Sequence, residues 1–210
     1  MNPNDLVKKV VMELKTLHEC GFRTWYSKAL ELTYRFNLKI ELDHKTFKKH
    51  SKLLIRRDFI QNWSQEINDI IKNPILITYQ LMKKDFELEP YLKLISNYKY
   101  RHAITKLRTS SHDLQIEKGR HTQLPLESRR CLYCNDIENE IHFLIKCKLF
   151  KAERIELYDR LSLDDFDRIV NQQDQFVYLM NSRNQRHLEI LGAFIFKCFK
   201  KRKSFIDSLN

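Results

Sequence analysis

The chain has 210 residues, of which 42% are hydrophobic and 11% aromatic, with 3 glycines and 4 prolines. It is long enough for one globular domain or two small ones, and its apolar content can build a core. So few glycines and prolines argue against a many-stranded β fold with its frequent turns and favour long helices. The formal net charge of +11 indicates a polyanionic partner, most often a nucleic acid. We therefore predict an all-α fold, a helical bundle with little or no β-structure.

The N-terminal residues contain no cationic start followed by an apolar run, so we expect no signal peptide. The longest apolar stretch near the end, Ile190 to Phe196, is too short to span a bilayer, and no membrane association is expected. The cysteines number 5, an odd count. Without a secretion signal, this count indicates free thiols or metal ligands rather than disulfides. We therefore expect an intracellular protein of the nucleus or cytoplasm.

The expected helices of the N-terminal part follow one another closely. Residues 5–17 and 24–36 carry apolar side chains at helical spacing, and Thr24 is a suitable cap for the second helix. A long helix begins after residue 43 and is closed by Pro74. Residues 75–82 add a short amphipathic segment.

The C-terminal part is expected to alternate helices with irregular chain. Residues 90–109 form one helix, and residues 110–130 look irregular, with one short strand at 113–117. Residues 138–160 and 185–205 form two further helices. We expect three regions in all: 1–82, an N-terminal helical region; 83–160, a basic helix plus a zinc-knuckle region; and 161–210, a C-terminal helical region.

Four residues in the pattern C-x2-C-x7-H-x4-C form a candidate metal site: Cys131, Cys134, His142 and Cys147. A C-x2-C pair lets two thiolates from one tight turn reach the same ion, and the histidine and the last cysteine complete a tetrahedron. Because four protein ligands close the coordination shell of Zn²⁺, the pattern predicts one structural ion rather than a catalytic one. The bound metal would fix the irregular chain that precedes it.

The alternative interpretation of these residues is a set of buried reduced thiols with a core histidine beside Phe143 and Leu144. The spacing and the absence of a secretion signal favour the metal. The two other cysteines, Cys20 and Cys198, lie alone in helical apolar patterns. For them we expect the role of a small buried hydrophobic residue.

Basic residues with aromatic neighbours lie before and within the cysteine motif. Cations beside a metal knuckle can pair with phosphates, and an exposed tyrosine can stack on an unpaired base. The alternative is a solvated helix face with core tyrosines. The lysine-rich run 45–57 and the tail 200–203 are expected to be ordinary charged surface. The predicted nucleic-acid contacts are Arg101, Arg108, Lys118, Arg120, Arg129, Arg130 and Tyr133.

Signals for an enzyme are poor. The sequence has no Gly-rich phosphate loop, no G-x-S-x-G and no H-E-x-x-H. Asp164 and Asp165 are adjacent acids of the kind that hold Mg²⁺, but Ser162 stands where a polymerase loop needs an aromatic residue. We expect these two aspartates to cap and charge a helix N-terminus, and we predict that the protein is not an enzyme.

Four segments have a recognisable pattern: residues 86–92, 100–103, 107–120 and 130–147. Together they resemble the C-terminal region of non-LTR (LINE-type) retrotransposon reverse transcriptases, which follows the polymerase and carries a C-C-H-C zinc knuckle. The match is best from 83 to 150. The resemblance implies that Cys131, Cys134, His142 and Cys147 are the ligands and that the knuckle and the basic segment before it help to hold template RNA or target DNA.

The departures from this family limit what the resemblance implies. The polymerase fingers and palm, the catalytic aspartate loop and an endonuclease signature are not found in the sequence. The chain thus looks like a detached or domesticated tail of such a protein, or like a truncated remnant with no retained activity. Catalysis does not follow from the resemblance.

Two functional hypotheses follow. The preferred one is a non-catalytic, zinc-dependent nucleic-acid-binding module. The other is an interaction module in which zinc only stabilises the fold and a protein partner binds the C-terminal helix. An exposed apolar stripe of Leu191, Ile195 and Phe199 would support this second hypothesis.

Overall fold

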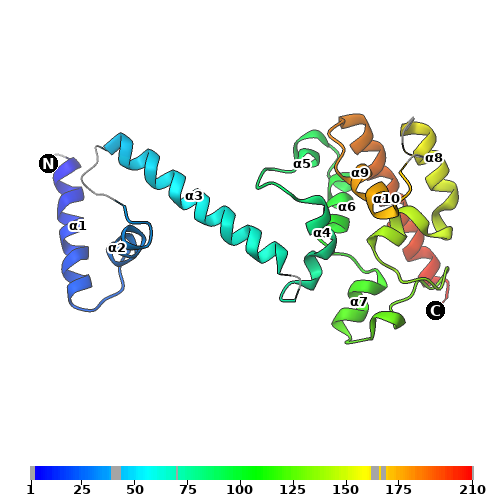
Figure 1. Ribbon diagram of the computed structural model, residues 1–210, viewed down its shortest axis with the longest axis horizontal. Coiled ribbons are helices and arrows are strands. Elements are labelled where there is room, and N and C mark those ends of the chain that lie inside the picture. Colours follow the sequence, from blue (N-terminus) through cyan, green and yellow to red (C-terminus); the bar gives the residue numbers. More distant parts are fainter. Residues whose placement is uncertain (1–2, 39–43, 70, 162–165, 167–168, 210) are drawn as a thin grey trace. The chain divides into compact units, whose positions relative to one another are not determined.

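The computed structural model describes residues 3–38, 44–69, 71–161, 166 and 169–209, and these residues form helices joined by loops (Figure 1). Within these ranges there is no strand or sheet, and the one β-type pairing is an isolated antiparallel bridge between Arg130 and Ile137. The prediction of an all-α protein is confirmed. The predicted helix cap at Asp164 and Asp165 lies outside the described residues.

The structure divides into two compact units, residues 1–65 and 66–210. This division does not test the three regions expected from the sequence, which stay a prediction. The N-terminal unit contains α1 (Pro3–Glu19), α2 (Trp25–Arg35) and most of α3 (His44–Asn68).

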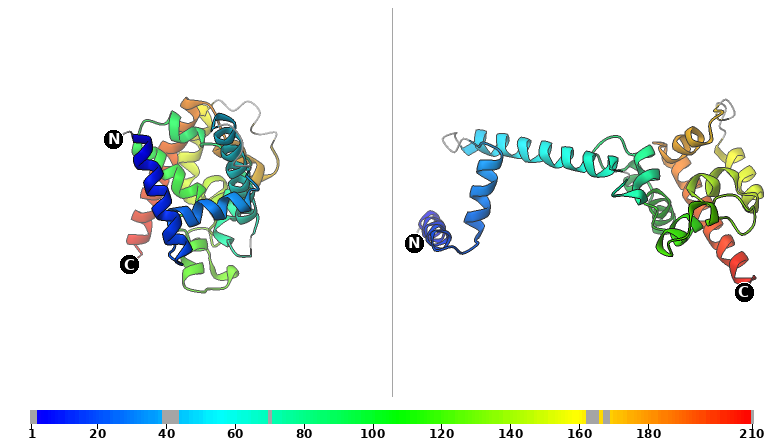
Figure 2. Two further views of the ribbon diagram at one scale, coloured as in Figure 1. Left: turned by 90° about the vertical axis from the view of Figure 1, so that its left-hand side faces the viewer. Right: turned by 60° about the horizontal axis from the view of Figure 1, so that its bottom comes forward.

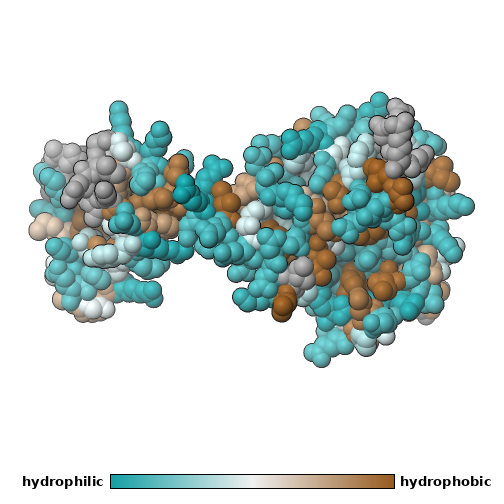
Figure 3. Space-filling model, viewed as in Figure 1, coloured by the Kyte–Doolittle hydropathy of each residue, from teal (hydrophilic) through white to brown (hydrophobic). Residues whose placement is uncertain are grey.

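In the N-terminal unit, α1 and α2 pack against each other. Thr24 caps α2 as predicted, because its side chain accepts a hydrogen bond from the Ser27 backbone N–H and its own N–H donates to the Ser27 hydroxyl. None of the described residues before residue 66 is buried. Trp25 and Phe59 are 68% and 58% exposed, and Figure 3 shows hydrophobic residues on the surface of this unit. These helices are amphipathic but have no core of their own.

The C-terminal unit is built around α10 (Gln185–Asp207), the long red helix of Figures 1 and 2. This helix packs against α5, α6 and α8. Its side chains Leu188, Leu191 and Ile195 are at most 1% exposed, so the apolar stripe of α10 forms the core of the unit. The other helices of this unit are η1 (Pro74–Leu76), α4 (Ile77–Met82), α5 (Pro90–Leu94), α6 (Tyr98–Arg108), α7 (Gln115–His121), η2 (Leu126–Ser128), η3 (His142–Lys146, a π-helical turn), η4 (Lys148–Phe150), α8 (Lys151–Leu161) and α9 (Gln172–Met180).

The contact between α6 and α10 is unusually close at Gly192. A Cβ atom at this position would lie 2.7 Å from the Cβ of Tyr100 and 3.2 Å from its carbonyl oxygen. Glycine is therefore required here by packing, since the two backbones leave no room for a methyl group.

Three of the expected elements were wrong in detail. The short strand at 113–117 is absent, and α7 begins at Gln115 instead, where the Glu138 carboxylate accepts the Gln115 backbone N–H at 2.7 Å. The expected helix 90–109 is two helices, because the chain leaves helical geometry after α5 and Asn97 caps α6 through the Lys99 N–H. The expected helix 138–160 is interrupted at Cys147, whose backbone is extended.

Candidate metal centre

The first two candidate ligands, Cys131 and Cys134, lie in a tight turn. The Asn135 N–H donates to the Cys131 carbonyl at 2.9 Å, and the Cys131 N–H donates to the Asp136 carbonyl at 2.7 Å. Asn135 has a φ of 60°, a left-handed conformation that asparagine tolerates better than most residues. The turn therefore reverses the chain within a few residues and places both sulfurs on one side.

The other two ligands, His142 and Cys147, flank the π-helical turn η3. The Cys147 N–H donates to the His142 carbonyl at 2.8 Å, a hydrogen bond across five residues. In an α-helix two residues five apart point about 140° away from each other, since each residue advances about 100°. The wider π turn reduces this angle, so that the H-x4-C spacing can present both side chains to one point.

The four ligand atoms lie within 4.8 Å of one another. The sulfur of Cys147 is 3.9 Å from that of Cys131 and 3.7 Å from that of Cys134. Sulfurs bound at about 2.3 Å to a tetrahedral ion are separated by about 3.8 Å, whereas a disulfide requires about 2.05 Å. The geometry fits a shared ion, and these four residues can hold one metal.

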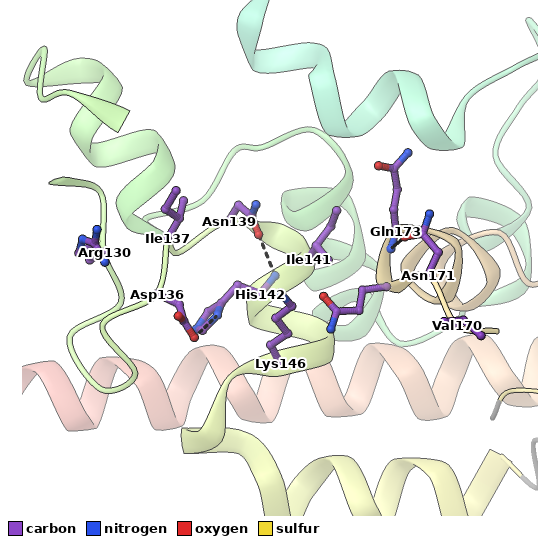
Figure 4. Close-up of a pocket in the computed structure, with 11 residues that line it drawn as sticks. Arg130, Asp136, Ile137, Asn139, Ile141, His142, Lys146, Val170, Asn171 and Gln173 are labelled. Atoms are coloured by element: carbon purple, nitrogen blue, oxygen red, sulfur yellow. Dashed lines mark hydrogen bonds and ion pairs between the residues drawn. The ribbon is translucent and has the colours of Figure 1, made fainter. Parts of the chain in front are cut away.

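The imidazole of His142 gives independent support for a metal. His142 is 3% exposed, and both of its ring nitrogens are buried without a hydrogen-bond partner among the described residues. A buried polar atom without a partner is costly in a folded protein, and coordination would satisfy one of the two nitrogens. The Asn139 side chain accepts the His142 backbone N–H at 2.8 Å and orients the residue (Figure 4).

Asp136 is positioned behind the histidine. Its Oδ2 lies 4.0 Å from His142 Nδ1, and the two side chains face each other in Figure 4. Carboxylates in this position orient a metal-binding imidazole through the ring nitrogen that does not bind the ion. We did not expect this role from the sequence, although the position of Asp136, two residues after Cys134, was available as a signal.

The thiols of Cys131 and Cys147 affect each other's pKa. Their hydrogen bond holds the pKa of Cys131 well below its ordinary value and raises the pKa of Cys147. The Lys148 backbone N–H donates to the Cys134 sulfur at 3.2 Å. Arg154 is buried nearby, and its guanidinium donates to the carbonyl of Cys147 at 2.7 Å. The lowered pKa of Cys131 and the N–H donated to the Cys134 sulfur favour thiolates at these two residues, and the thiolate is the form that binds metal.

The two cysteines outside the site differ from each other. Cys198 is fully buried in α10, as predicted, and burial raises its pKa. Cys20 is exposed, so the prediction of a buried position was wrong for this residue. It follows α1 in a unit whose described residues have no buried core.

Arg108, one of the predicted phosphate contacts, is a core residue. It is 1% exposed, and its guanidinium donates to the Met180 carbonyl at 2.6 Å and to the Glu89 carboxylate at 2.8 Å. The prediction was wrong here, because a guanidinium that is buried and bound to a carboxylate is not available to a nucleic acid. Arg120 is likewise paired, with the buried carboxylate of Glu117.

Arg129 and Arg130 use their guanidinium groups to hold the chain before the knuckle. Arg129 donates twice to the Leu124 carbonyl, at 3.0 and 2.8 Å. Arg130 donates to the carbonyls of Glu127 and Asn135, both at 2.7 Å. These bonds fix loop geometry and occupy donors that the sequence analysis assigned to phosphates.

The remaining candidates are more accessible. Lys118 is exposed on α7 and has no acidic partner among the described residues. Tyr133 is 51% exposed and packs edge-on against Phe205, with ring centroids 5.4 Å apart. Arg101 donates to the Ile95 carbonyl at 2.9 Å and is partly exposed. The structure therefore does not gather the seven residues into one surface.

The C-terminal helix does not offer the apolar stripe that an interaction module would need. Leu191 and Ile195 are buried, and Phe199 stacks on Phe143 with ring centroids 4.6 Å apart. These side chains form the core of the unit, so this docking surface for a protein partner is not present.

Comparison of the sequence and structure with protein-family models, curated proteins and solved structures finds no match. The resemblance to retrotransposon reverse transcriptases therefore rests on the segments quoted above and stays a prediction. Among the described residues, no helix combines the length and the hydrophobicity needed to cross a membrane.

Proposed function

We propose that the protein is a non-catalytic nucleic-acid-binding module whose fold depends on one Zn²⁺ ion held by Cys131, Cys134, His142 and Cys147. The observation that carries the proposal is the convergence of these four ligand atoms within 4.8 Å. Three thiolates and one imidazole are a donor set typical of structural zinc, whereas Mg²⁺ and Ca²⁺ prefer oxygen ligands. Such thiols persist in a reducing compartment, which supports a place in the nucleus or cytoplasm.

Several features around the metal centre support a nucleic acid as the partner. The net charge is +11. A cavity of about 700 Å³ lies beside His142 and is lined by the basic side chains of Arg130 and Lys146 and by the amides of Asn171 and Gln173 (Figure 4). Basic and amide side chains are common contacts to phosphates and bases. The resemblance noted above implies the same class of partner.

The zinc part of the proposal is tested by metal analysis of the purified full-length protein. We expect one zinc per chain in the wild type and in Cys20→Ser, whose thiol is exposed and is not one of the four candidate ligands. We expect loss of the ion in Cys134→Ser and His142→Ala, since each removes one of four ligands. Wild-type protein without zinc would contradict the proposal.

The nucleic-acid part is tested by fluorescence anisotropy with labelled single-stranded RNA and DNA at several salt concentrations. Binding should weaken steeply with salt, because each neutralised phosphate contributes about −0.7 to the slope of log K against log salt. Binding should also be lost when zinc is chelated. Failure to bind either nucleic acid at low salt, or affinity that does not change with salt, would overturn this part.

A further inference from the structure

A second basic surface lies away from the metal ligands, between α6 and α10. It is a groove of about 330 Å³, with lysines on both walls and aromatic rings between them. The groove lysines are Lys99 and Lys106 from α6 and Lys200 and Lys203 from α10.

The four groove lysines differ from Lys197 and Lys201 of α10, which have acidic partners. Lys197 and Lys201 form ion pairs with glutamates of α8, at 3.2 and 2.9 Å. The groove lysines have no acidic partner among the described residues. The one acidic side chain that lines the groove, Asp113, is bound by Arg202 at 3.1 Å. The groove thus keeps an unneutralised positive field, which an anion would relieve.

Aromatic rings line the same groove. Tyr98 is 65% exposed, and its ring stacks on that of His102 with centroids 5.6 Å apart and an interplanar angle of 15°. From the other wall, the Lys200 Nζ lies 4.7 Å from the ring centroid of Phe196. Flat rings interleaved with cations are the surface on which unpaired bases stack while their phosphates are neutralised.

We propose that this groove binds one unpaired nucleotide of a single-stranded nucleic acid. The groove lysines would hold its phosphate groups, and the exposed ring of Tyr98 would stack on its base. The inference rests on the proposed function in that the partner is a nucleic acid. It adds a site separate from the zinc knuckle and assigns it unpaired chain rather than duplex.

The charge requirement is tested on the zinc-loaded full chain with a fluorescent oligothymidylate. The double variant Lys99→Glu, Lys106→Glu should weaken binding by about tenfold or more, since two phosphate-pairing cations become anions. The matched control is Lys93→Glu, Lys151→Glu, which makes the same charge change at exposed residues that do not line the groove. It should weaken binding by less than about threefold. Equal losses in the two double variants would overturn the proposal.

The base requirement is tested with Tyr98→Ala, a substitution at an exposed residue. It should weaken oligothymidylate binding by about 5- to 100-fold, the effect expected for loss of one stacked base. An abasic oligomer of the same length should bind the wild type as weakly as oligothymidylate binds the variant, and Tyr98→Ala should not weaken abasic binding further. A duplex should bind equally to wild type and variant. An equal effect of Tyr98→Ala on abasic and normal oligomers would contradict stacking.

A titration with thymidine monophosphate, followed by NMR, separates this inference from the proposed function. Wild-type protein should show shifts of the ring signals of Tyr98, and inorganic phosphate should leave these signals unchanged. If the mononucleotide moves these signals while no oligomer binds, the groove is a nucleotide site and the proposed function fails. If oligomers bind but both groove variants match their controls and these signals do not move, the groove proposal alone fails.

Discussion

His142 has two buried ring nitrogens without a hydrogen-bond partner among the described residues. One ring nitrogen lies within 4.8 Å of the three candidate ligand sulfurs, and Nδ1 lies 4.0 Å from the Asp136 carboxylate. A metal on one nitrogen would fix the proton on the other, where it can face the Asp136 carboxylate. Most of Asp136 is exposed to solvent, so its contribution depends on this orientation rather than on burial.

The substitution Asp136→Asn should therefore weaken zinc binding without abolishing it. We expect a decrease in affinity of about 10- to 100-fold, the usual effect of removing a carboxylate behind a metal-binding histidine. Competition with a chromophoric chelator measures it. Asp159→Asn, at an exposed position of α8, is the control and should leave the affinity unchanged. Equal affinities for the wild type and Asp136→Asn would show that the carboxylate does not orient the ring.

Glu140 is a second residue with a defined electrostatic role. It is 3% exposed, and its carboxylate accepts hydrogen bonds from Ser110 at 2.6 Å, Thr78 at 3.0 Å and His112 at 3.0 Å. Burial alone would raise its pKa, but the hydrogen bonds from His112 and Ser110 outweigh burial and lower the pKa below the ordinary 4.5.

This shift predicts how Glu140 contributes to stability at each pH. Since the folded pKa is lower than the unfolded one, the contribution is complete above pH 4.5 and is lost as the pH falls through the folded value. The melting temperature of Glu140→Gln should therefore lie below that of the wild type at pH 7, and the gap should narrow below pH 4.5. Glu127→Gln, at an exposed position, should show no gap at any pH. A gap that widens on acidification would contradict the assignment.

At the scale of helices, patterns local in sequence predicted the long elements well. The helix expected at 185–205 is α10, and the cap expected at Thr24 is present. The helix α9 was not foreseen, because its nine residues begin with polar side chains and are too few to show a helical repeat. The residue that could have indicated the start of α9 is Asn171, whose side chain caps the helix by accepting the Gln173 N–H at 2.9 Å.

The breaks within helices were not predictable, because their causes lie outside the local sequence. The interruption at Cys147 follows from the π turn that aligns it with His142. The start of α7 depends on the side chain of Glu138, distant in sequence. Hydrophobic periodicity contains no information about either contact, since it reports only which face of a helix is buried.

A substitution at Gly192 tests the closeness of α6 and α10. Alanine is the better helix former by about 1 kcal/mol, so propensity alone predicts that Gly192→Ala stabilises the protein. Its Cβ would lie 2.7 Å from the Tyr100 Cβ, an atom fixed to the backbone, so the helices must separate. We expect a net loss of about 1–3 kcal/mol, measured by urea denaturation of the zinc-loaded protein. A rise in stability would show that α6 and α10 can separate without cost.

At the scale of the whole molecule, the net charge leads us to expect a nucleic acid as the partner, which stays a prediction, but it does not say which residues would contact it. The four candidate metal ligands could be predicted because their spacing is local, and the structure brings all four together. The accessible arginines could not be predicted, because the partner of an arginine is set by the fold. Arg108, a predicted phosphate contact, is buried against Glu89, 19 residues away. Arg202 lies in the tail that we expected to be ordinary charged surface, and it is buried against Glu138, 64 residues away.

The two units should differ in stability, because every described residue that is buried lies after residue 65. A chain of residues 66–210 should keep one zinc ion and a cooperative thermal transition, and its melting temperature should be close to that of the full chain. Calorimetry and metal analysis of the two proteins measure this. A chain of residues 66–210 that melts without a cooperative transition would show that the first unit is required for the core.

Arg202 connects the chain of the metal motif to the helix that carries two of the groove lysines. Its guanidinium binds both carboxylate oxygens of Glu138 at 2.7 Å, and Glu138 belongs to the chain between the second and third metal ligands. Within one turn of Arg202 on the same helix, Lys200 and Lys203 line the groove. Metal occupancy and oligomer affinity should therefore be thermodynamically linked, and linkage acts in both directions. A saturating oligothymidylate should slow the transfer of zinc from the protein to a chelator, and Lys99→Glu, Lys106→Glu should remove that protection.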